Sequence, residues 1–195
     1  MEISSTQLKQ LRDQTGISVM QCKKALEEAG GDMEKAVIIL KKKRSEAADK
    51  KADRELAAGS IGSYIHNTNE VAALVLLACE TDFVSKNEEF VALAKDIAMH
   101  VAASNPKYIS KSEIDETIIA KATEVFTAEI GDKPAEMHAK ILEGKMASYF
   151  KEQILMEQDF IKNPETTIGE MISGAVQKFG ENVSIARISR LSVKQ

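Results

Sequence analysis

The hydrophobic period of this chain first changes near Gly59, and the change divides the sequence into two parts of different architecture. Before it, apolar residues recur at helical spacing between strong helix caps. After it, small apolar, β-branched and leucine residues run without interruption from Val71 to Leu77, which is typical of a buried strand. We therefore expect a helical amino-terminal part followed by a domain that combines helices with a sheet.

Three short helices are predicted at the amino terminus by their capping residues. Ser4 begins the first helix, with Gln7 placed to complete a capping box, and Ser18 and Asp32 begin the second and third. The apolar positions that we expect to face inward are Leu8, Leu11, Met20, Ala25, Leu26, Ala36, Val37 and Leu40. Residues 1–43 therefore resemble a three-helix module of the ubiquitin-associated type, with a core too small to be very stable alone.

The segment after this module, residues 44–58, is predicted to be a linker helix. Residues 41–55 consist almost entirely of Lys, Arg, Glu, Asp and Ala, which favour a helix in water and bury little surface. The basic run Lys41-Lys42-Lys43-Arg44 is a candidate contact for RNA. Its interleaved acidic neighbours and the absence of aromatic residues favour a solvated helix face instead, so we expect no direct binding of nucleic acid.

The remainder of the chain, residues 59–195, is predicted to be an α+β core. Two antiparallel strands meet at the turn Asn67-Thr68-Asn69, and a helix that starts at a capping box of Ser85 and Glu88 packs on them. The remaining predicted elements are helices at about 112–130, 134–157 and 167–178, a loop at Asn163-Pro164 and a last strand from Val183 to Leu191. We therefore expect a small antiparallel sheet covered by helices.

Several classes of protein are excluded by simple features of the sequence. The longest apolar run, Val71 to Cys79, covers nine residues, whereas a membrane-spanning helix needs about 20. Residues 1–5 lack the pattern of a signal or transit peptide, which predicts a cytoplasmic protein. Cys22 and Cys79 are far apart and lie in apolar patterns, so they are predicted to be reduced core residues.

Neither a cofactor nor a metal is expected from the distribution of histidines and charges. His66, His100 and His138 share no metal-type spacing with one another or with cysteines. Residues 1–54 hold 12 Lys and Arg against 9 Asp and Glu, while residues 55–195 hold 14 against 21. An acidic body with a basic amino-terminal part does not indicate nucleic acid as the main partner.

The segment from Cys79 to Lys86 is the most informative candidate for a binding site. It joins a predicted buried strand to the start of a helix, and loops held by rigid elements on both sides are where binding residues collect. Taken alone, these residues favour a structural role, in which Phe83 folds back onto the core and Asp82 caps the helix.

Two blocks of sequence nevertheless resemble the signature blocks of the elongation factor Ts family. One runs from Leu11-Arg12-Asp13-Gln14-Thr15-Gly16 through Cys22-Lys23-Lys24-Ala25-Leu26, and the other is Thr81-Asp82-Phe83-Val84-Ser85-Lys86. Further similar segments lie at 62–66, 97–104 and 179–185, so the resemblance covers essentially the whole chain. The chain is thereby identified as a member of this family in its short bacterial form, with a single core subdomain.

The resemblance implies a guanine nucleotide exchange factor for elongation factor Tu in translation elongation, and no enzyme. In the family, the ring that corresponds to Phe83 inserts with the neighbouring aspartate, here Asp82, between helices of the GTPase near its magnesium site. Thr81 and Val84 flank this wedge. Because magnesium requires near-ideal octahedral geometry, displacing a supporting helix of the GTPase by ~1 Å weakens the binding of magnesium, and this in turn weakens the binding of GDP. Since the exchange factor weakens GDP binding, GDP weakens binding of the factor by the same ratio, so the factor binds the nucleotide-free GTPase most tightly.

The resemblance also implies that the amino-terminal module docks on the nucleotide-binding domain of elongation factor Tu. The residues implicated by position are Arg12, Val19, Met20 and Lys23. Packing in the module's own core remains an equal alternative for Met20. Gln21 departs from the Asp that is usual before the Cys-Lys-Lys block, and this substitution removes a charge but keeps hydrogen bonding.

Secondary contacts and the oligomeric state follow from the same comparison with longer relatives. His66 and the segment Phe179-Gly180-Glu181 correspond to further contacts on the GTPase, and ordinary surface or core roles remain open for them. A single copy of the core implies a symmetric homodimer that holds two GTPases. The last strand, Val183 to Leu191, or the adjoining sheet edge is the natural place for the dimer contact, and both edge pairing and face packing remain open.

Two rival functions are compatible with parts of the sequence. The amino-terminal module alone is consistent with a binding module for nascent chains or another helper protein, but this gives no reason for the Thr81–Val84 segment. A small cysteine or histidine enzyme requires a base near Cys79 or Cys22 in a cleft. Thiol labelling tests the second alternative, since a reactive cysteine of low pKa is modified fast and a buried one is not.

Overall fold

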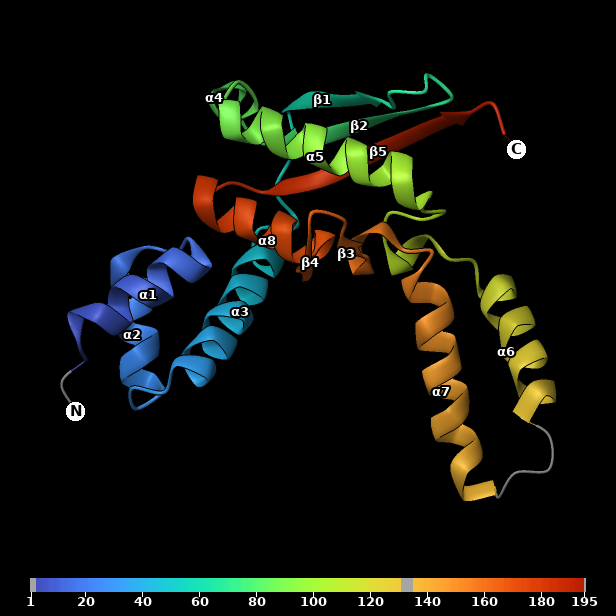
Figure 1. Cartoon of the computed structure of the whole chain (residues 1–195), viewed down its shortest axis with the longest axis horizontal. Helices are drawn as coiled ribbons and strands as arrows, with labels where there is room; N and C mark the ends of the chain where they lie inside the picture. Colours follow the sequence, from blue (N-terminus) through green and yellow to red (C-terminus); the bar gives the residue numbers. More distant parts are fainter. Residues whose placement is uncertain (1–2, 131–134, 195) are drawn as a thin grey trace.

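The computed structural model describes residues 3–130 and 135–194. It shows an amino-terminal group of helices, a central sheet with helices against it, and a helical hairpin that projects away from the sheet (Figure 1). The predicted α+β class is therefore confirmed. None of the helices in the described part of the chain is both long and apolar enough to cross a bilayer.

The amino-terminal group consists of α1 (Ser5–Thr15), α2 (Val19–Glu28) and α3 (Met33–Asp49). Each helix begins at the predicted cap, because the side chains of Ser4, Ser18 and Asp32 accept hydrogen bonds from backbone N–H groups three residues later. The buried residues of the module are Leu11, Ile17, Cys22, Ala25, Leu26, Ala36 and Leu40. The structure thus contains the predicted three-helix module with its small core.

The predicted linker helix is not a separate element. Helix α3 continues through residue 43 without a break and ends at Asp49, because the composition of this segment contains nothing that stops a helix. Turns follow, in which the N–H groups of Lys51 and Arg54 donate to carbonyl groups three residues earlier. The carboxyl-terminal half of α3 also lies against the core, where Ala48 packs on the main hydrophobic cluster. None of residues 44–58 is fully buried, in agreement with the prediction that this segment buries little, and Ala48 is only partly covered.

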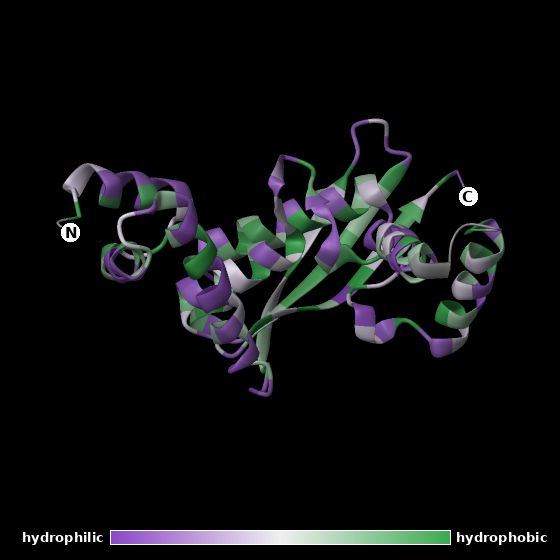
Figure 2. Ribbon diagram, turned by 90° about the horizontal axis from the view of Figure 1, so that it is seen from below, coloured by the Kyte–Doolittle hydropathy of each residue, from purple (hydrophilic) through white to green (hydrophobic). Residues whose placement is uncertain are grey.

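The central sheet has three antiparallel strands in the order β1-β2-β5. Their bounds are β1 (Ala58–Ile65), β2 (Val71–Cys79) and β5 (Val183–Ser192), close to the prediction. Helices α5 (Glu88–Ser104) and α8 (Ile168–Phe179) lie on the same side of the sheet (Figure 1). Figure 2 shows the strands largely in the colour of hydrophobic residues, whereas the outer helices alternate between hydrophobic and hydrophilic residues. The main core fills the space between the sheet and these two helices.

The other face of the sheet is apolar and uncovered. Ile61 and Ile65 of β1, Leu74 of β2 and Leu191 of β5 are 68%, 66%, 51% and 72% exposed. The register places Ile61 beside Leu76, and Ile65 beside Ala72, which in turn pairs with Leu191. These outward positions lie on all three strands, with Ser63 and Ser189 on either side of Leu74. This side of the sheet is called here the open face.

The start of α5 differs in detail from the prediction. Its cap is Asn87, whose side-chain oxygen accepts a hydrogen bond from Glu89 N at 2.9 Å, and no capping box of Ser85 and Glu88 forms. Ser85 instead closes a short helix, α4 (Asp82–Ser85), and its hydroxyl donates to Asp82 O at 3.2 Å. The chain therefore makes one separate helical turn before α5 begins.

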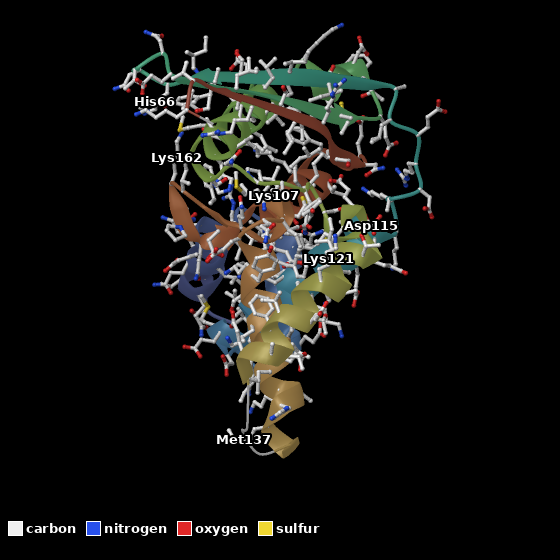
Figure 3. The ribbon with its side chains drawn as sticks, turned by 90° about the vertical axis from the view of Figure 1, so that its right-hand side faces the viewer. His66, Lys107, Asp115, Lys121, Met137 and Lys162 are labelled. Carbon is white, nitrogen blue, oxygen red and sulfur yellow. The ribbon has the colours of Figure 1, made fainter. Side chains whose placement is uncertain are left out.

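The segment after α5 forms the projecting hairpin and returns to the core. Helices α6 (Glu116–Ile130) and α7 (Ala135–Lys151) lie side by side and share a third small cluster. The predicted start of the second helix, residue 134, lies outside the described residues. Figure 3 shows Met137 near the far end of the hairpin, well away from His66 on the sheet.

The structure also contains a small element that the sequence did not predict. Strands β3 (Asp159–Phe160) and β4 (Asn163–Thr167) pair where a loop was expected. Two short 3₁₀ turns, Lys111–Glu113 and Leu155–Glu157, flank the base of the helical hairpin. Proline is tolerated in this pairing because it lies in an edge strand of a two-stranded sheet.

Candidate partner-binding site

The candidate wedge stands at the corner where β2 ends and α4 begins. Phe83 is 87% exposed, the largest exposure among the large hydrophobic side chains that are described. The next residue, Val84, is buried in the main core. Because successive residues of a helix point about 100° apart, the single turn of α4 directs one apolar side chain inward and its neighbour into solvent.

The charged member of the wedge is also exposed and is paired locally. Lys86 Nζ lies 2.7 Å from Asp82 Oδ2 across one helical turn. This hydrogen bond and the lysine charge lower the pKa of Asp82. The carboxylate is therefore ionised at neutral pH and is available to a partner, because the pair is open to solvent and such pairs contribute little to stability.

A carboxylate from the far end of the chain holds this corner from behind. Glu181 accepts hydrogen bonds from Glu80 N at 3.1 Å and from Thr81 N at 3.0 Å through one oxygen. Its other oxygen accepts from the Thr81 hydroxyl at 2.6 Å. Hydrogen bonds to an ionised acceptor are the strong ones, so Glu181 fixes the backbone immediately before Asp82 and Phe83. We call this arrangement the Glu181 clamp.

A reciprocal set of contacts runs in the opposite direction. Glu80 accepts a hydrogen bond from Asn182 N, and Arg54 Nη1 lies 3.3 Å from the same oxygen, Glu80 Oε1. The hydrogen bond from Asn182 is the largest cause that lowers the pKa of Glu80. The side chain of Asn182 in turn donates to Ala52 O at 3.2 Å and to Arg54 O at 3.1 Å. The corner is thus connected to β5 and to the turns after α3.

Phe179 and Gly180 lie next to this clamp and make contacts within the chain. The ring of Phe179 meets Phe90 edge-on, with centroids 5.8 Å apart, and it packs against the main core while remaining half-buried. Gly180 ends α8 with a positive φ of 74°, a conformation that favours glycine. These residues therefore have structural roles here, and a contact with a partner stays a prediction.

The predicted docking residues of the module are exposed. Val19 and Met20 are 46% and 70% exposed, and Lys23 pairs only with the neighbouring Glu27 at 3.9 Å. Arg12 is also exposed, on α1. Met20 is therefore not a core residue, and the three residues on α2 are free to form one contact surface because positions 19, 20 and 23 lie on adjacent turns.

His66 lies away from the wedge. It is exposed beside the β1–β2 turn, where its Nδ1 is 3.0 Å from the Thr68 hydroxyl oxygen. Figure 1 shows this turn at one end of the sheet and α4 at the other. The structure therefore does not bring His66 and Phe83 into one site. His66 instead borders an open groove of about 750 Å³ with Tyr64, Met99 and Arg190.

No catalytic arrangement is formed by Cys22, Cys79 and His100. Cys22 and Cys79 are both fully buried. Burial raises the pKa of the Cys79 thiol, which donates to Thr81 O at 3.2 Å. His100 is buried and lies 2.8 Å from Gln158. Among the residues that the structure describes, no group of three or more histidines, cysteines or carboxylates could hold a metal ion.

Sequence reasoning did not identify the residues that support the wedge. Glu181 was expected only as part of a secondary contact on the GTPase, together with Phe179 and Gly180, and Glu80, Asn182 and Arg54 were given no role. The only signal in the sequence was a glutamate beside each of the two segments that meet at the corner, Glu80 and Glu181. The partners of these glutamates could not be identified, because the bonds between Thr81 and Glu181 span 100 residues of sequence.

Comparisons with known proteins bear on the whole chain. A family model described as Elongation factor TS matches residues 48–175. Elongation factor Ts of Thermodesulfovibrio yellowstonii is 47% identical over 196 residues, which cover 100% of this chain and 98% of that protein. The proteins of the same name from Carboxydothermus hydrogenoformans and Fervidobacterium nodosum are 43% and 42% identical, covering 98% and 99% of this chain and 89% and 99% of their own length. With its two signature blocks in place, the chain belongs to the elongation factor Ts family.

Proposed function

We propose that this protein is a translation elongation factor that acts in the cytoplasm as the guanine nucleotide exchange factor of elongation factor Tu. The observation that carries the proposal is Phe83, an aromatic side chain that is 87% exposed on a corner held by the Glu181 clamp. Family membership supplies the partner. The exposed surface of α2 supplies a second contact on the same partner.

The wedge has enough apolar surface to act on a packed helix pair. Burying a phenylalanine stabilises a complex by about 1.5–3 kcal/mol, and the rigid corner means that little of this is lost in ordering the ring. A displacement of ~1 Å in a helix that supports magnesium weakens the octahedral site. GDP binding and binding of this protein then oppose each other by the same factor. The chain needs no catalytic group, because GTP displaces it by mass action.

The test is stopped-flow release of a fluorescent GDP analogue from elongation factor Tu. We expect the native chain to accelerate release, and Phe83→Ala to lower that acceleration roughly ten- to a hundredfold, from the loss of about 1.5–3 kcal/mol of contact. Val125→Ala is a matched control, because Val125 is a 56% exposed apolar residue on the projecting hairpin. Absence of any acceleration by the native chain refutes the exchange function.

A double variant separates the wedge from the family assignment. If Asp82→Ala with Phe83→Ala leaves the acceleration intact, the exchange function stands and the wedge is the wrong mechanism. The contact must then be sought on the module, where Met20→Ala and Lys23→Ala are the next substitutions. Both side chains are exposed, so their loss leaves the fold intact.

We also propose that the protein is a homodimer whose copies pack through the open face. Ile61, Ile65, Leu74 and Leu191 are exposed apolar side chains on all three strands, and exposed apolar patches mark interaction sites. Pairing through the edge of β5 depends on main-chain groups and tolerates a charge on the open face. Leu74→Glu in the central strand is therefore expected to give monomers by analytical ultracentrifugation. A variant that remains dimeric contradicts face packing, and a monomeric native chain contradicts the dimer.

A further inference from the structure

Helix α8 lies between the two surfaces that the proposed function requires. Figure 1 shows it below the sheet and next to the module that carries α1 and α2. One stripe of α8, formed by Glu170, Gly174 and Gln177, faces α3. A wedge and a separate docking module act together only if their separation and orientation match the partner, so the contacts of this helix bear directly on exchange.

Arg44 of α3 is the central contact of this stripe. Its Nε donates to Gln177 Oε1 at 3.3 Å, and its Nη2 donates to Thr15 O at the end of α1 at 3.2 Å. The guanidinium also lies over Gly174 of α8, where a Cβ would be in ordinary van der Waals contact with Nη1 at 3.5 Å. Arg44 therefore joins three helices, two from the module and one from the core.

A second bond closes the arrangement on the other side of the module. Gln177 Nε2 donates to Gln21 Oε1 of α2 at 2.8 Å. Gln21 is the residue that departs from the Asp common in the family. In this chain its amide oxygen accepts a hydrogen bond from the core. We call Arg44, Gln177 and Gln21 the clasp.

The surroundings of the clasp are loosely packed. An open hollow of about 710 Å³ lies between module and core, lined by residues that include Arg12, Ile17 and Met171. Apolar packing across this junction is therefore incomplete, and directional polar contacts decide the orientation of the module. Lys41 adds one of them, with its Nζ 2.8 Å from Glu170 Oε1.

The carboxyl-terminal end of α8, which carries Gln177, also leads to the wedge. Lys51 donates to Gly180 O at 2.6 Å, where the helix ends, and the next residue, Glu181, holds Thr81. Gln177 and Glu181 are only four positions apart at this end of α8. The clasp and the support of Phe83 therefore lie at the same end of one rigid helix.

We propose that Arg44 and Gln177 are positioning residues that hold the module in its partner-ready orientation before the GTPase is met. The inference rests on the proposed exchange function. Neither residue needs to touch the partner. Fixing the module in advance lowers the entropy lost on binding, so the clasp acts on the concentration at which exchange half-saturates and leaves the maximal rate nearly unchanged.

The first experiment measures the orientation in the free, full-length chain. Spin labels at Lys9→Cys on α1 and Lys95→Cys on α5 report the distance between module and core by pulsed electron paramagnetic resonance. Cys22 and Cys79 are fully buried and do not compete for the label. We expect one narrow distance distribution in the labelled parent and a broad one after Arg44→Ala with Gln177→Ala. Unchanged distributions overturn the inference.

The control substitution removes an ion pair made by α3, the helix that carries Arg44, in which both partners belong to the module. Lys43 pairs with Glu28 of α2, so Lys43→Ala is expected to leave the distance distribution narrow. Circular dichroism establishes that each variant is folded. If the double variant does not fold, Gln177→Ala alone removes one bond from Arg44 and the bond to Gln21, and the same two outcomes decide.

The second experiment measures nucleotide release with the same variants. Loss of the clasp removes three hydrogen bonds and is expected to raise the half-saturating concentration about tenfold or more. Arg44→Lys is expected to be intermediate. A broad distribution with an unchanged half-saturating concentration overturns the positioning role. If the native chain does not accelerate GDP release from elongation factor Tu, the proposed function fails. The distance measurement then still tests whether the clasp orders the module.

Discussion

The Glu181 clamp predicts that two substitutions at one position have very different effects. Glu181→Ala removes the acceptor of three hydrogen bonds, from Glu80 N, Thr81 N and the Thr81 hydroxyl. Glu181→Gln keeps one oxygen for the two N–H groups. Its amide nitrogen can donate to the Thr81 oxygen, because a hydroxyl accepts as well as donates. Glutamine therefore preserves the geometry and loses only the charge.

The size of the effect follows from the number of bonds and their exposure. A hydrogen bond to a charged group contributes about 1.5–3 kcal/mol. Thr81 is exposed and Glu181 is half-buried, so water replaces part of what is lost in the alanine variant. We take about 2 kcal/mol as the net loss of local stability at the corner, which corresponds to roughly a thirtyfold loss of amide protection. The glutamine variant is expected to lose only a few-fold of this amide protection.

Amide hydrogen exchange of Glu80 and Thr81 measures this loss in the free chain, and GDP release from elongation factor Tu measures its consequence. The alanine variant is expected to accelerate release several-fold less than the native chain. Unchanged protection in Glu181→Ala refutes the clamp as the support of the corner. If glutamine impairs GDP release as much as alanine while protecting the amides, the charge acts on the partner and the positioning role is wrong.

Three further predictions concern stability. A Cβ at Gly62 would lie 2.0 Å from Ala94 O, so Gly62→Ala is expected to lower the free energy of unfolding by about 3 kcal/mol. Gly144→Ala, in open space within α7, is expected to raise it by about 0.5–1 kcal/mol; urea denaturation checks both. Burial lowers the pKa of His100 below its usual 6.5, against the opposing hydrogen bond to Gln158. Because the unfolded chain then binds the proton more readily, stability falls as pH drops below about 6.5. Thermal melts at pH 7 and pH 5 are expected to show a smaller loss in His100→Gln, and an equal loss contradicts the assignment.

Those parts of the fold that depend on local rules were predictable from the sequence. The caps at Ser4 and Asp32 bond to residues three positions away, so the sequence contains all of their determinants. The strands β1 and β2 followed from the change of period at Gly59. The continuation of α3 past residue 43 is also local in origin, because the charged segment contains nothing that stops a helix there.

Those parts that depend on distant partners were not predictable. Ser85 and Asn87 both have side chains suited to cap a helix, and the choice between them depends on the corner before α4, which Glu181 holds from 100 residues away. The pairing of β3 with β4 involves strands too short to give a periodic pattern. The clasp was invisible for the same reason, since Gln21 and Gln177 are separated by 156 positions.

Phe83 is exposed, whereas its neighbours fill the core behind it. Val84 already occupies the inward position of α4, and Phe90 fills the core beneath with no exposed surface. The ring of Phe83 is 87% exposed, so the structural role favoured by the residues alone does not hold. An aromatic ring that is exposed on its own domain gains about 1.5–3 kcal/mol on being buried by another protein. Stability of the free chain and action on a partner are thus separable at this position, unlike at Glu181, which supports both.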